Sequence, residues 1–184
     1  MRMNDNPANS GSSSDVLRSF IALPAGERTR KQLCSVQDRL KEANAGVSWV
    51  PPAHMHISLA FLGDIFRHET DMISRLLDEA AALTCPLTLQ AEGIGTFGGR
   101  RSPRVIWAGI AANDQLKSLH GRITRLLTAI DMPVDTRKFL PHITLGRVRS
   151  DRNRKALIQT IETHRTSRFD QFHVEKIYLM NSIL

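Results

Sequence analysis

The sequence predicts an α+β fold built from largely antiparallel sheets. Stretches with strand-like alternation and stretches with helical spacing follow one another along the 184 residues, but several strands are joined by connections too short for a crossover helix. No Gly-x-Gly-x-x-Gly or Walker-type loop joins a strand to a following helix, which argues against a doubly wound nucleotide-binding fold. The chain length and a hydrophobic content of 41% suit one soluble domain with a single core.

Seven segments show the alternation or the short apolar runs that are typical of strands. The first is ended by Pro24 and Gly26, and the third ends at the turn pair Gly63-Asp64. A loop rich in Gly and Arg separates the fourth segment from the fifth. The expected strands are 16–23, 48–50, 54–62, 87–91, 105–110, 140–148 and 172–180.

Four segments carry apolar residues at helical spacing. Leu33, Val36 and Leu40 form such a stripe in the first segment, and Pro133 stops the third. The expected helices are 27–43, 69–83, 116–130 and 156–163.

The composition limits the partners and the compartment. A formal net charge of +7 favours polyanionic partners such as nucleic acid, nucleotides or an anionic membrane surface. No run of about 18 apolar residues occurs, so we expect no membrane-spanning segment. Two cysteines and the lack of an apolar leader favour a reduced, cytoplasmic location. Residues 1–15 are rich in Asn, Ser and Gly, and we expect a disordered tail there, followed by one domain over residues 16–184.

A short polar motif occurs twice, each time in an expected strand. His-Ile-Ser-Leu at 56–59 returns as His-Ile-Thr-Leu at 142–145, and prolines precede both copies. The separation is too long for a solenoid repeat and suits two halves of one domain that each offer an equivalent strand.

Side chains alternate across a strand, so each copy has a polar face and a core face. In the first copy the polar face carries His56, Ser58 and Ala60, and the core face carries Ile57, Leu59 and Phe61. In the second copy the polar face carries His142, Thr144 and Gly146. Each strand therefore presents an imidazole and a hydroxyl side by side.

Two imidazoles suit the cleavage of a phosphodiester by water. The reaction needs a base that activates the water and an acid that protonates the leaving oxygen, and histidine titrates near neutrality. We therefore expect His56 and His142 to act as an acid–base pair. Ser58 and Thr144 are expected to donate hydrogen bonds to phosphate oxygens. This mechanism requires neither a metal nor another cofactor.

Two other interpretations of the histidines stay open from the sequence. A histidine in a strand is more often structural than functional, although packing alone has no need to repeat a polar pair. His54 and His56 also form a ligand-like pair on one strand face, which His142 would extend to a three-histidine metal site. The metal site is disfavoured because His54 has no counterpart near His142.

Basic and aromatic residues near the motifs are candidates for substrate binding. Arg147 stands just beyond the second motif, where its guanidinium suits bidentate binding of a phosphate. Arg101 lies in the Gly-rich loop and is a candidate RNA contact. Phe97 in the same loop either stacks on a base or packs in the core. Trp49 and Trp107 are expected in the core.

The paired motifs and their flanks resemble the two-histidine phosphoesterases, and most closely the bacterial and archaeal RNA 2′,3′-cyclic phosphodiesterases, also called 2′-5′ RNA ligases. The segments that carry the resemblance are 18–23, 47–51, 56–63, 104–109 and 141–147. It implies a two-lobed α+β fold, in which largely antiparallel sheets face a central cleft and the helices lie outside. It also implies metal-independent opening of cyclic phosphates at RNA 3′ ends, which leaves a 2′-phosphate. In that reaction His56 is the acid and His142 the base.

The resemblance also indicates partners and alternatives. The expected partner is RNA or an oligonucleotide with a 2′,3′-cyclic phosphate end, with tRNA fragments among the candidates, bound by a monomer that contacts no membrane. The alternatives are cleavage or ligation of 2′-5′ linkages by the same site, or a non-catalytic module that binds nucleotides or RNA. Two features depart from the family pattern: Ser58 stands where the family usually has Thr, and the chain ends at 181–184 where relatives continue into a further strand.

Overall fold

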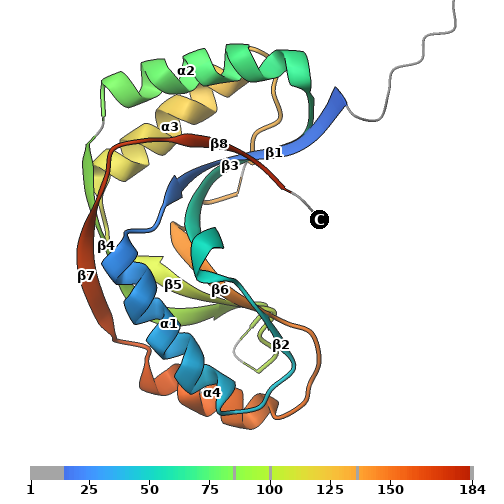
Figure 1. Ribbon diagram of the computed structural model, residues 1–184, viewed down its shortest axis with the longest axis vertical. Coiled ribbons are helices and arrows are strands. Elements are labelled where there is room, and N and C mark those ends of the chain that lie inside the picture. The colour runs from blue at the N-terminus through green and yellow to red at the C-terminus, as the bar shows by residue number, and fades with distance from the viewer. Residues whose placement is uncertain (1–14, 85, 100, 136, 183–184) are drawn as a thin grey trace, which may run out of the picture.

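The computed structural model describes residues 15–84, 86–99, 101–135 and 137–182. The expected tail lies outside these residues, apart from Asp15. The chain forms a C-shaped body in which helices cover both ends and the strand at residues 168–174 runs along the outer left side (Figure 1). Within the described residues, no helix is long and apolar enough to cross a membrane.

Eight strands form one hydrogen-bonded sheet, and every registered pair in it is antiparallel. The order along the sheet is β7-β4-β5-β6-β3-β1-β8, with β2 paired to β6. This arrangement confirms the expected α+β class with antiparallel pairing. The strands are β1 (Val16–Pro24), β2 (Val47–Trp49), β3 (His56–Phe66), β4 (Leu87–Phe97), β5 (Val105–Ile110), β6 (His142–Val148), β7 (Arg168–Val174) and β8 (Tyr178–Asn181).

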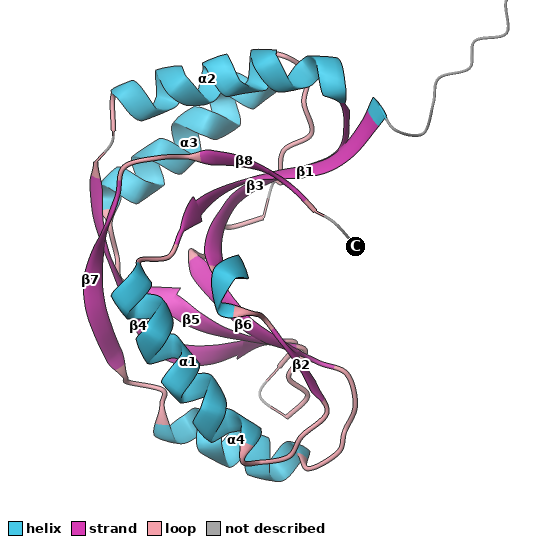
Figure 2. Ribbon diagram, viewed as in Figure 1, coloured by secondary structure: helices cyan, strands magenta, loops and turns pink. Residues whose placement is uncertain are grey.

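The four expected helices are present and lie outside the sheet (Figure 2). They are α1 (Glu27–Lys41), α2 (Thr70–Ala82), α3 (Asp114–Thr128) and α4 (Arg154–Thr163). Helix α3 illustrates why they form there: the Asn113 side chain accepts a hydrogen bond from the Leu116 backbone N–H and caps the helix. A buried stripe of apolar residues then faces the sheet, namely Leu116, Leu119, Ile123 and Leu127.

Two lobes meet at a narrow junction between β3 and β6. The first lobe contains β1, β3, β8, α2 and α3, and the second lobe contains the other strands with α1 and α4. The only registered pair between β3 and β6 in the described chain is Ile57 with Ile143, and both side chains are fully buried. The two expected sheets are thus halves of one sheet that is pinched at this pair.

The expected strand over residues 172–180 is wrong, because it is two strands on opposite edges of the sheet. β7 pairs with β4 in the second lobe, and β8 pairs with β1 in the first. Burial alternates from Phe172 to Val174 and then breaks at Glu175 and Lys176, which are both exposed. These two residues lie where the chain crosses from one lobe to the other (Figure 1).

The expected end of a strand at Ala91 is also wrong, since β4 continues to Phe97. Gly93 adopts a φ of +68°, and the register with β5 shifts between Glu92 and Ile94. Such a bulge lets the strand continue through a position that L-residues disfavour. Gly93 and Gly95 therefore lie within a bulged strand that ends at Phe97, and Gly98 and Gly99 follow it.

Candidate active site

The two polar motifs lie on β3 and β6, side by side at the junction of the lobes. Because Ile57 pairs with Ile143, the antiparallel register places His56 across from Thr144 and Ser58 across from His142. These four side chains point away from the buried isoleucine pair, and all four are partly buried. We call the surface formed by His56, Ser58, His142 and Thr144 the histidine face.

The imidazole ring of each candidate catalytic histidine forms an equivalent hydrogen bond to the backbone. Nδ1 of His56 lies 2.7 Å from the carbonyl oxygen of His54, and Nδ1 of His142 lies 2.7 Å from the carbonyl oxygen of Leu140. A carbonyl only accepts hydrogen bonds, so Nδ1 carries the proton in both rings. In the neutral ring Nε2 then bears the lone pair with which a base accepts a proton. In the protonated ring Nε2 carries the proton that an acid donates.

Both rings favour the neutral form. Burial lowers the pKa of His56 from its usual 6.5, the bond to the His54 carbonyl opposes this, and repulsion from His54 and His142 adds to it. Burial likewise lowers the pKa of His142, against the bond to Leu140, and the Arg147 guanidinium lowers it further. The repulsion between the two imidazoles means that a proton on one ring disfavours a proton on the other.

A β-bulge occurs at the last residue of each motif. Leu59 of β3 is skipped in the register with β1, and Leu145 of β6 is skipped in the register with β5. The extra residue reverses the alternation, so the side chains five positions after each histidine return to the histidine face. These are Phe61, which is 59% exposed, and Arg147. The expectation that Phe61 faces the core is therefore wrong.

Aromatic rings surround both histidines. The Phe20 ring centroid lies 4.9 Å from that of His56, and the Phe97 ring meets His142 edge-on at 4.8 Å. Trp107 lies 6.3 Å from His142 and 5.4 Å from Phe97. Phe97 thus contacts the site and does not belong to the buried core.

Trp107 was placed wrongly from the sequence, and Phe20 was not identified as a residue of the site. Trp107 was expected in the core, but it is only partly buried, and it alternates with buried Ile106 and Ala108 along β5. That alternation is the signal that would have placed it on the histidine side. Phe20 alternates in the same way with buried Ser19 and Ile21.

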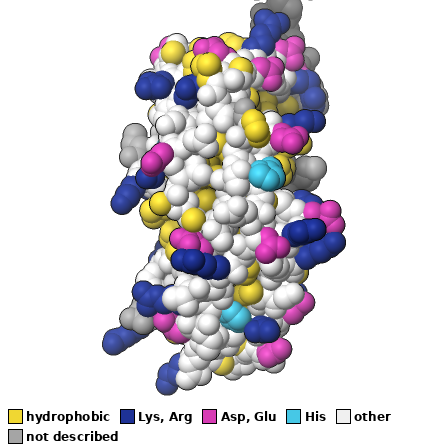
Figure 3. Space-filling model, turned by 90° about the vertical axis from the view of Figure 1, so that its left-hand side faces the viewer, with side chains coloured by type: hydrophobic (Ala, Val, Ile, Leu, Met, Phe, Trp, Pro, Cys, Tyr) yellow, Lys and Arg dark blue, Asp and Glu magenta, His cyan; other side chains and the backbone are white. Residues whose placement is uncertain are grey.

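The basic candidates divide between the histidine face and the surface. Arg147 lies near enough to His142 to lower its pKa. Arg101 is exposed in the turn after β4, and its carbonyl accepts a hydrogen bond from the Arg154 guanidinium. The outer side on which β7 lies mixes acidic with basic side chains, so it offers no surface of a single sign (Figure 3).

The alternative of a three-histidine metal site has no support in the arrangement of the three side chains. His54 lies in a 3₁₀ turn, Pro52–His54, so it does not share a strand face with His56, which begins β3. The expectation of a strand from residue 54 is therefore wrong at its first two residues. Among the residues with described placement, no group of three His, Cys, Asp or Glu side chains is arranged to hold a metal ion.

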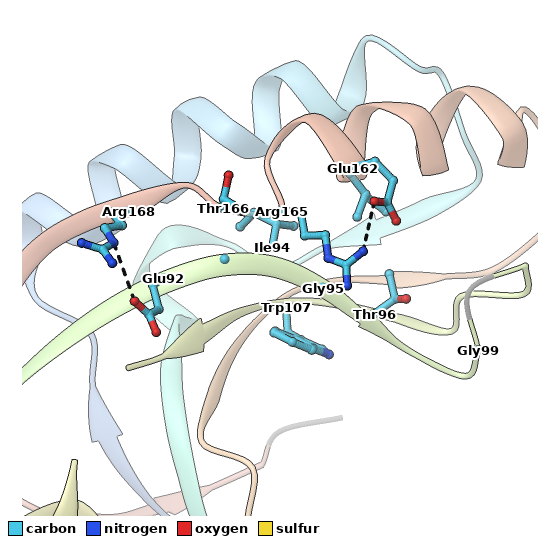
Figure 4. Close-up of a pocket in the computed structure, with 12 residues that line it drawn as sticks. Glu92, Ile94, Gly95, Thr96, Gly99, Trp107, Glu162, Arg165, Thr166 and Arg168 are labelled. Atoms are coloured by element: carbon cyan, nitrogen blue, oxygen red, sulfur yellow. Dashed lines mark ion pairs between the residues drawn. The ribbon is translucent and has the colours of Figure 1, made fainter. Parts of the chain in front are cut away.

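A cavity of about 620 Å³ lies beside the bulge of β4 and the end of α4, and neither catalytic candidate lines it (Figure 4). Its arginines are paired with carboxylates: Arg165 with Glu162 at 3.5 Å and Arg168 with Glu92 at 4.0 Å. Trp107 lies on the opposite side of the β4 ribbon from these pairs (Figure 4). Trp107 also lines the cavity, so the cavity and the surroundings of His142 share this residue, although neither histidine lines it.

Comparisons with known proteins place the chain in a family. Residues 23–107 and 109–184 match the model of the LigT-like phosphoesterases. The RNA 2′,3′-cyclic phosphodiesterase of Aquifex aeolicus is 31% identical over 174 residues, which are 92% of this chain and 90% of that protein. The enzyme of the same name from Thermotoga maritima is 31% identical over a region that covers 72% of this chain and 71% of that protein.

Solved structures agree with the fold. TT0787 of Thermus thermophilus superposes with a TM-score of 0.69 at 26% identity, covering 89% of this chain and 87% of that one. E. coli LigT complexed with 3′-AMP gives a TM-score of 0.71 at 22% identity, covering 92% and 90%. The chain belongs to the LigT-like phosphoesterase family.

Proposed function

We propose that the chain hydrolyses the 2′,3′-cyclic phosphate at RNA 3′ ends to a 2′-phosphate, with His56 and His142 as its acid–base pair. The observation that carries the proposal is the pair of imidazoles on one face, each with Nδ1 bonded to the carbonyl two residues earlier. The relatives named RNA 2′,3′-cyclic phosphodiesterase support the substrate class. The substrates include tRNA fragments, and the enzyme acts as a cytoplasmic monomer without a metal.

The reaction follows from the two Nε2 atoms. Neutral His142 takes a proton from water while the water oxygen bonds to phosphorus. The bond from phosphorus to the 3′ oxygen breaks, and protonated His56 gives its Nε2 proton to that oxygen. The hydroxyls of Ser58 and Thr144 donate to the non-bridging oxygens as charge develops on them. One proton enters the pair and one leaves, so the enzyme is restored after proton exchange between the rings and solvent.

The surroundings of each ring support this division of roles. Arg147 favours the neutral form of His142, as a base requires. Both histidines have an aromatic neighbour at a similar distance, so the Arg147 guanidinium distinguishes their surroundings. Because each ring disfavours a proton on the other, the working state is a pair that shares one proton.

The function is tested by product analysis in a chelator. We expect the purified protein in EDTA to convert 2′,3′-cyclic AMP and an oligonucleotide with a cyclic phosphate end to the 2′-phosphate. A 3′-phosphate product would contradict the assigned leaving oxygen, and tight binding without turnover would favour a binding module. Loss of activity in EDTA with rescue by zinc or manganese would contradict the metal-free mechanism. Ligation is the same ring opening with an RNA 5′-hydroxyl attacking phosphorus in place of water; the bond to the 3′ oxygen breaks and a 2′-5′ linkage forms, and cleavage of that linkage is the reverse reaction.

The pH dependence should reflect the two lowered pKa values. We expect a bell-shaped profile of kcat/KM, because activity rises as the base loses its proton and falls as the acid loses its own. Burial lowers the pKa of both rings, so both limbs should lie to the acidic side of those of solvent-exposed histidines. Arg147→Ala should move the rising limb to higher pH, since Arg147 lowers the pKa of His142. A shift of the falling limb alone would reverse the two roles.

The basic surface beyond the second motif should bind the RNA strand. Arg149 is exposed, and its Nε donates to the Ser48 hydroxyl at 3.2 Å. We expect Arg149→Ala and Arg101→Ala to weaken binding of a cyclic-phosphate oligonucleotide more than that of a cyclic mononucleotide, and to reduce the salt dependence. Arg165→Ala is the matched control, because Arg165 pairs with Glu162 beside the cavity. Equal losses on both ligands would mean that Arg149 and Arg101 do not contact the strand.

A further inference from the structure

The two carbonyls that hold the catalytic rings are themselves held in different ways. The His54 carbonyl belongs to a closed turn, in which the His54 N–H donates to Pro51 at 2.9 Å and the Met55 N–H donates to Pro52 at 3.2 Å. Met55 is 2% exposed, and its own carbonyl accepts a bond from the Ala25 N–H. The backbone and a buried anchor therefore fix the acceptor for His56.

The acceptor for His142 has no such backbone support. Among bonds between described residues, no backbone–backbone hydrogen bond involves Phe139 or Leu140. The Leu140 side chain is 53% exposed and does not anchor the segment. The first backbone bond is at Pro141, whose carbonyl accepts from the Ile110 N–H at 3.1 Å. The segment 139–140 is therefore held by the neighbouring bond at Pro141 and by the Phe139 side chain, which packs against the core.

The Phe139 side chain also forms a ring stack with helix α3. The rings of His120 and Phe139 are nearly parallel, with an angle of 8° between planes and 3.9 Å between centroids. His120 follows buried Leu119 on α3, so it projects from a helix that is fixed to the core. Burial lowers the pKa of His120, against the attraction of the Asp135 carboxylate, which favours a neutral ring in the stack.

We propose that His120 is a positioning residue for His142. Its stack on Phe139 holds the adjacent Leu140 carbonyl, and that carbonyl fixes the tautomer and the orientation of the His142 ring. The expected effect on kcat rests on the proposed function, whereas the expected effect on the His142 tautomer does not. A residue outside both motifs is thereby assigned to the positioning of His142. The position of His56 does not depend on His120.

The direct test is the tautomer of each histidine, read from the ¹⁵N chemical shifts of the ring nitrogens in histidine-labelled protein. In wild type we expect His56 and His142 to be protonated at Nδ1 in their neutral forms. His120→Ala should mix the tautomers of His142 and leave those of His56 unchanged. It should also lower kcat roughly 10–100-fold with KM within about twofold, since a displaced base affects the chemical step. His120→Phe keeps a flat ring on Phe139 and should restore both readouts.

A second stack supplies the control. His68 stacks on Phe66 at 5.5 Å and 13° in the same lobe, away from both motifs. His68→Ala should therefore leave the tautomers and kcat unchanged. If His120→Ala fails to fold, His120→Leu makes the same comparison with its apolar volume retained.

The inference would be overturned if the ¹⁵N chemical shifts of His142 were unchanged in the folded His120→Ala variant. It would also be overturned if the chemical shifts of His56 and His142 changed equally. A wild-type protein without turnover, in which the His142 shifts still respond to His120, would overturn the proposed function and leave the positioning role intact.

Discussion

Replacing either His56 or His142 by alanine is expected to lower kcat/KM on a 2′,3′-cyclic phosphate by about 10²–10⁴, because each variant removes one proton transfer. The double variant should lose less than the product of the two single losses, since the rings share one proton and act as a unit. Initial rates on 2′,3′-cyclic AMP measure the effect, and thermal unfolding confirms that the variants are folded.

The matched control for this prediction is His173→Ala. His173 is exposed on β7, where its Nδ1 lies 3.0 Å from the Thr88 hydroxyl. Removing this imidazole should leave the rate unchanged. A wild-type rate in either His56→Ala or His142→Ala would show that the reaction does not use the pair.

Ser58→Ala and Thr144→Ala are expected to have the next largest effects. Each variant removes one hydrogen bond to a charged phosphate, which is worth about 1–3 kcal/mol, or roughly 5–150-fold in kcat/KM. The loss should appear mainly in kcat, because negative charge on the non-bridging oxygens grows toward the transition state. Rates at saturating and at low substrate separate kcat from KM.

Conservative variants make this prediction specific to the hydroxyl. Ser58→Thr and Thr144→Ser keep the donor and should retain most of the activity, whereas Thr144→Val keeps the shape and should lose as much as alanine. Thr88→Ala removes a strand hydroxyl that contacts His173 and should have no effect. Equal rates for Thr144→Val and wild type would remove the hydroxyl from the mechanism.

The sequence predicted the centre of the histidine face because strand alternation acts over neighbouring residues. His56 and Ser58 lie two apart on β3, as His142 and Thr144 do on β6, and no bulge intervenes within either pair. The repeat then indicated that two equivalent strands belong together. Their contact through Ile57 and Ile143 is a consequence of that symmetry.

The alternation failed where an extra residue entered the strand. The skipped Leu59 turns Phe61 toward the histidine face, and the skipped Leu145 does the same for Arg147. A bulge depends on pairing with a distant strand, so periodicity alone does not reveal it. The same limit applies at Gly93, where a positive φ continues β4 beyond its expected end.

Long-range contacts account for the remaining differences. The segment 172–180 has apolar residues on both sides of Glu175 and Lys176, and these two parts form β7 and β8, which pair with partners at opposite edges of the sheet. Likewise, the stack of His120 on Phe139 joins a helix to a loop, and no local pattern relates the two residues.

The most direct test of the acid–base pair is a substrate whose leaving group needs no proton, such as a nitrophenyl phosphodiester. The acid is dispensable on that substrate, whereas the base still has to activate water. We predict that His56→Ala recovers toward the wild-type rate on the nitrophenyl ester and that His142→Ala stays impaired. Recovery of His142→Ala in place of His56→Ala would contradict the assigned roles, and equal impairment of both variants would contradict acid–base catalysis by the pair.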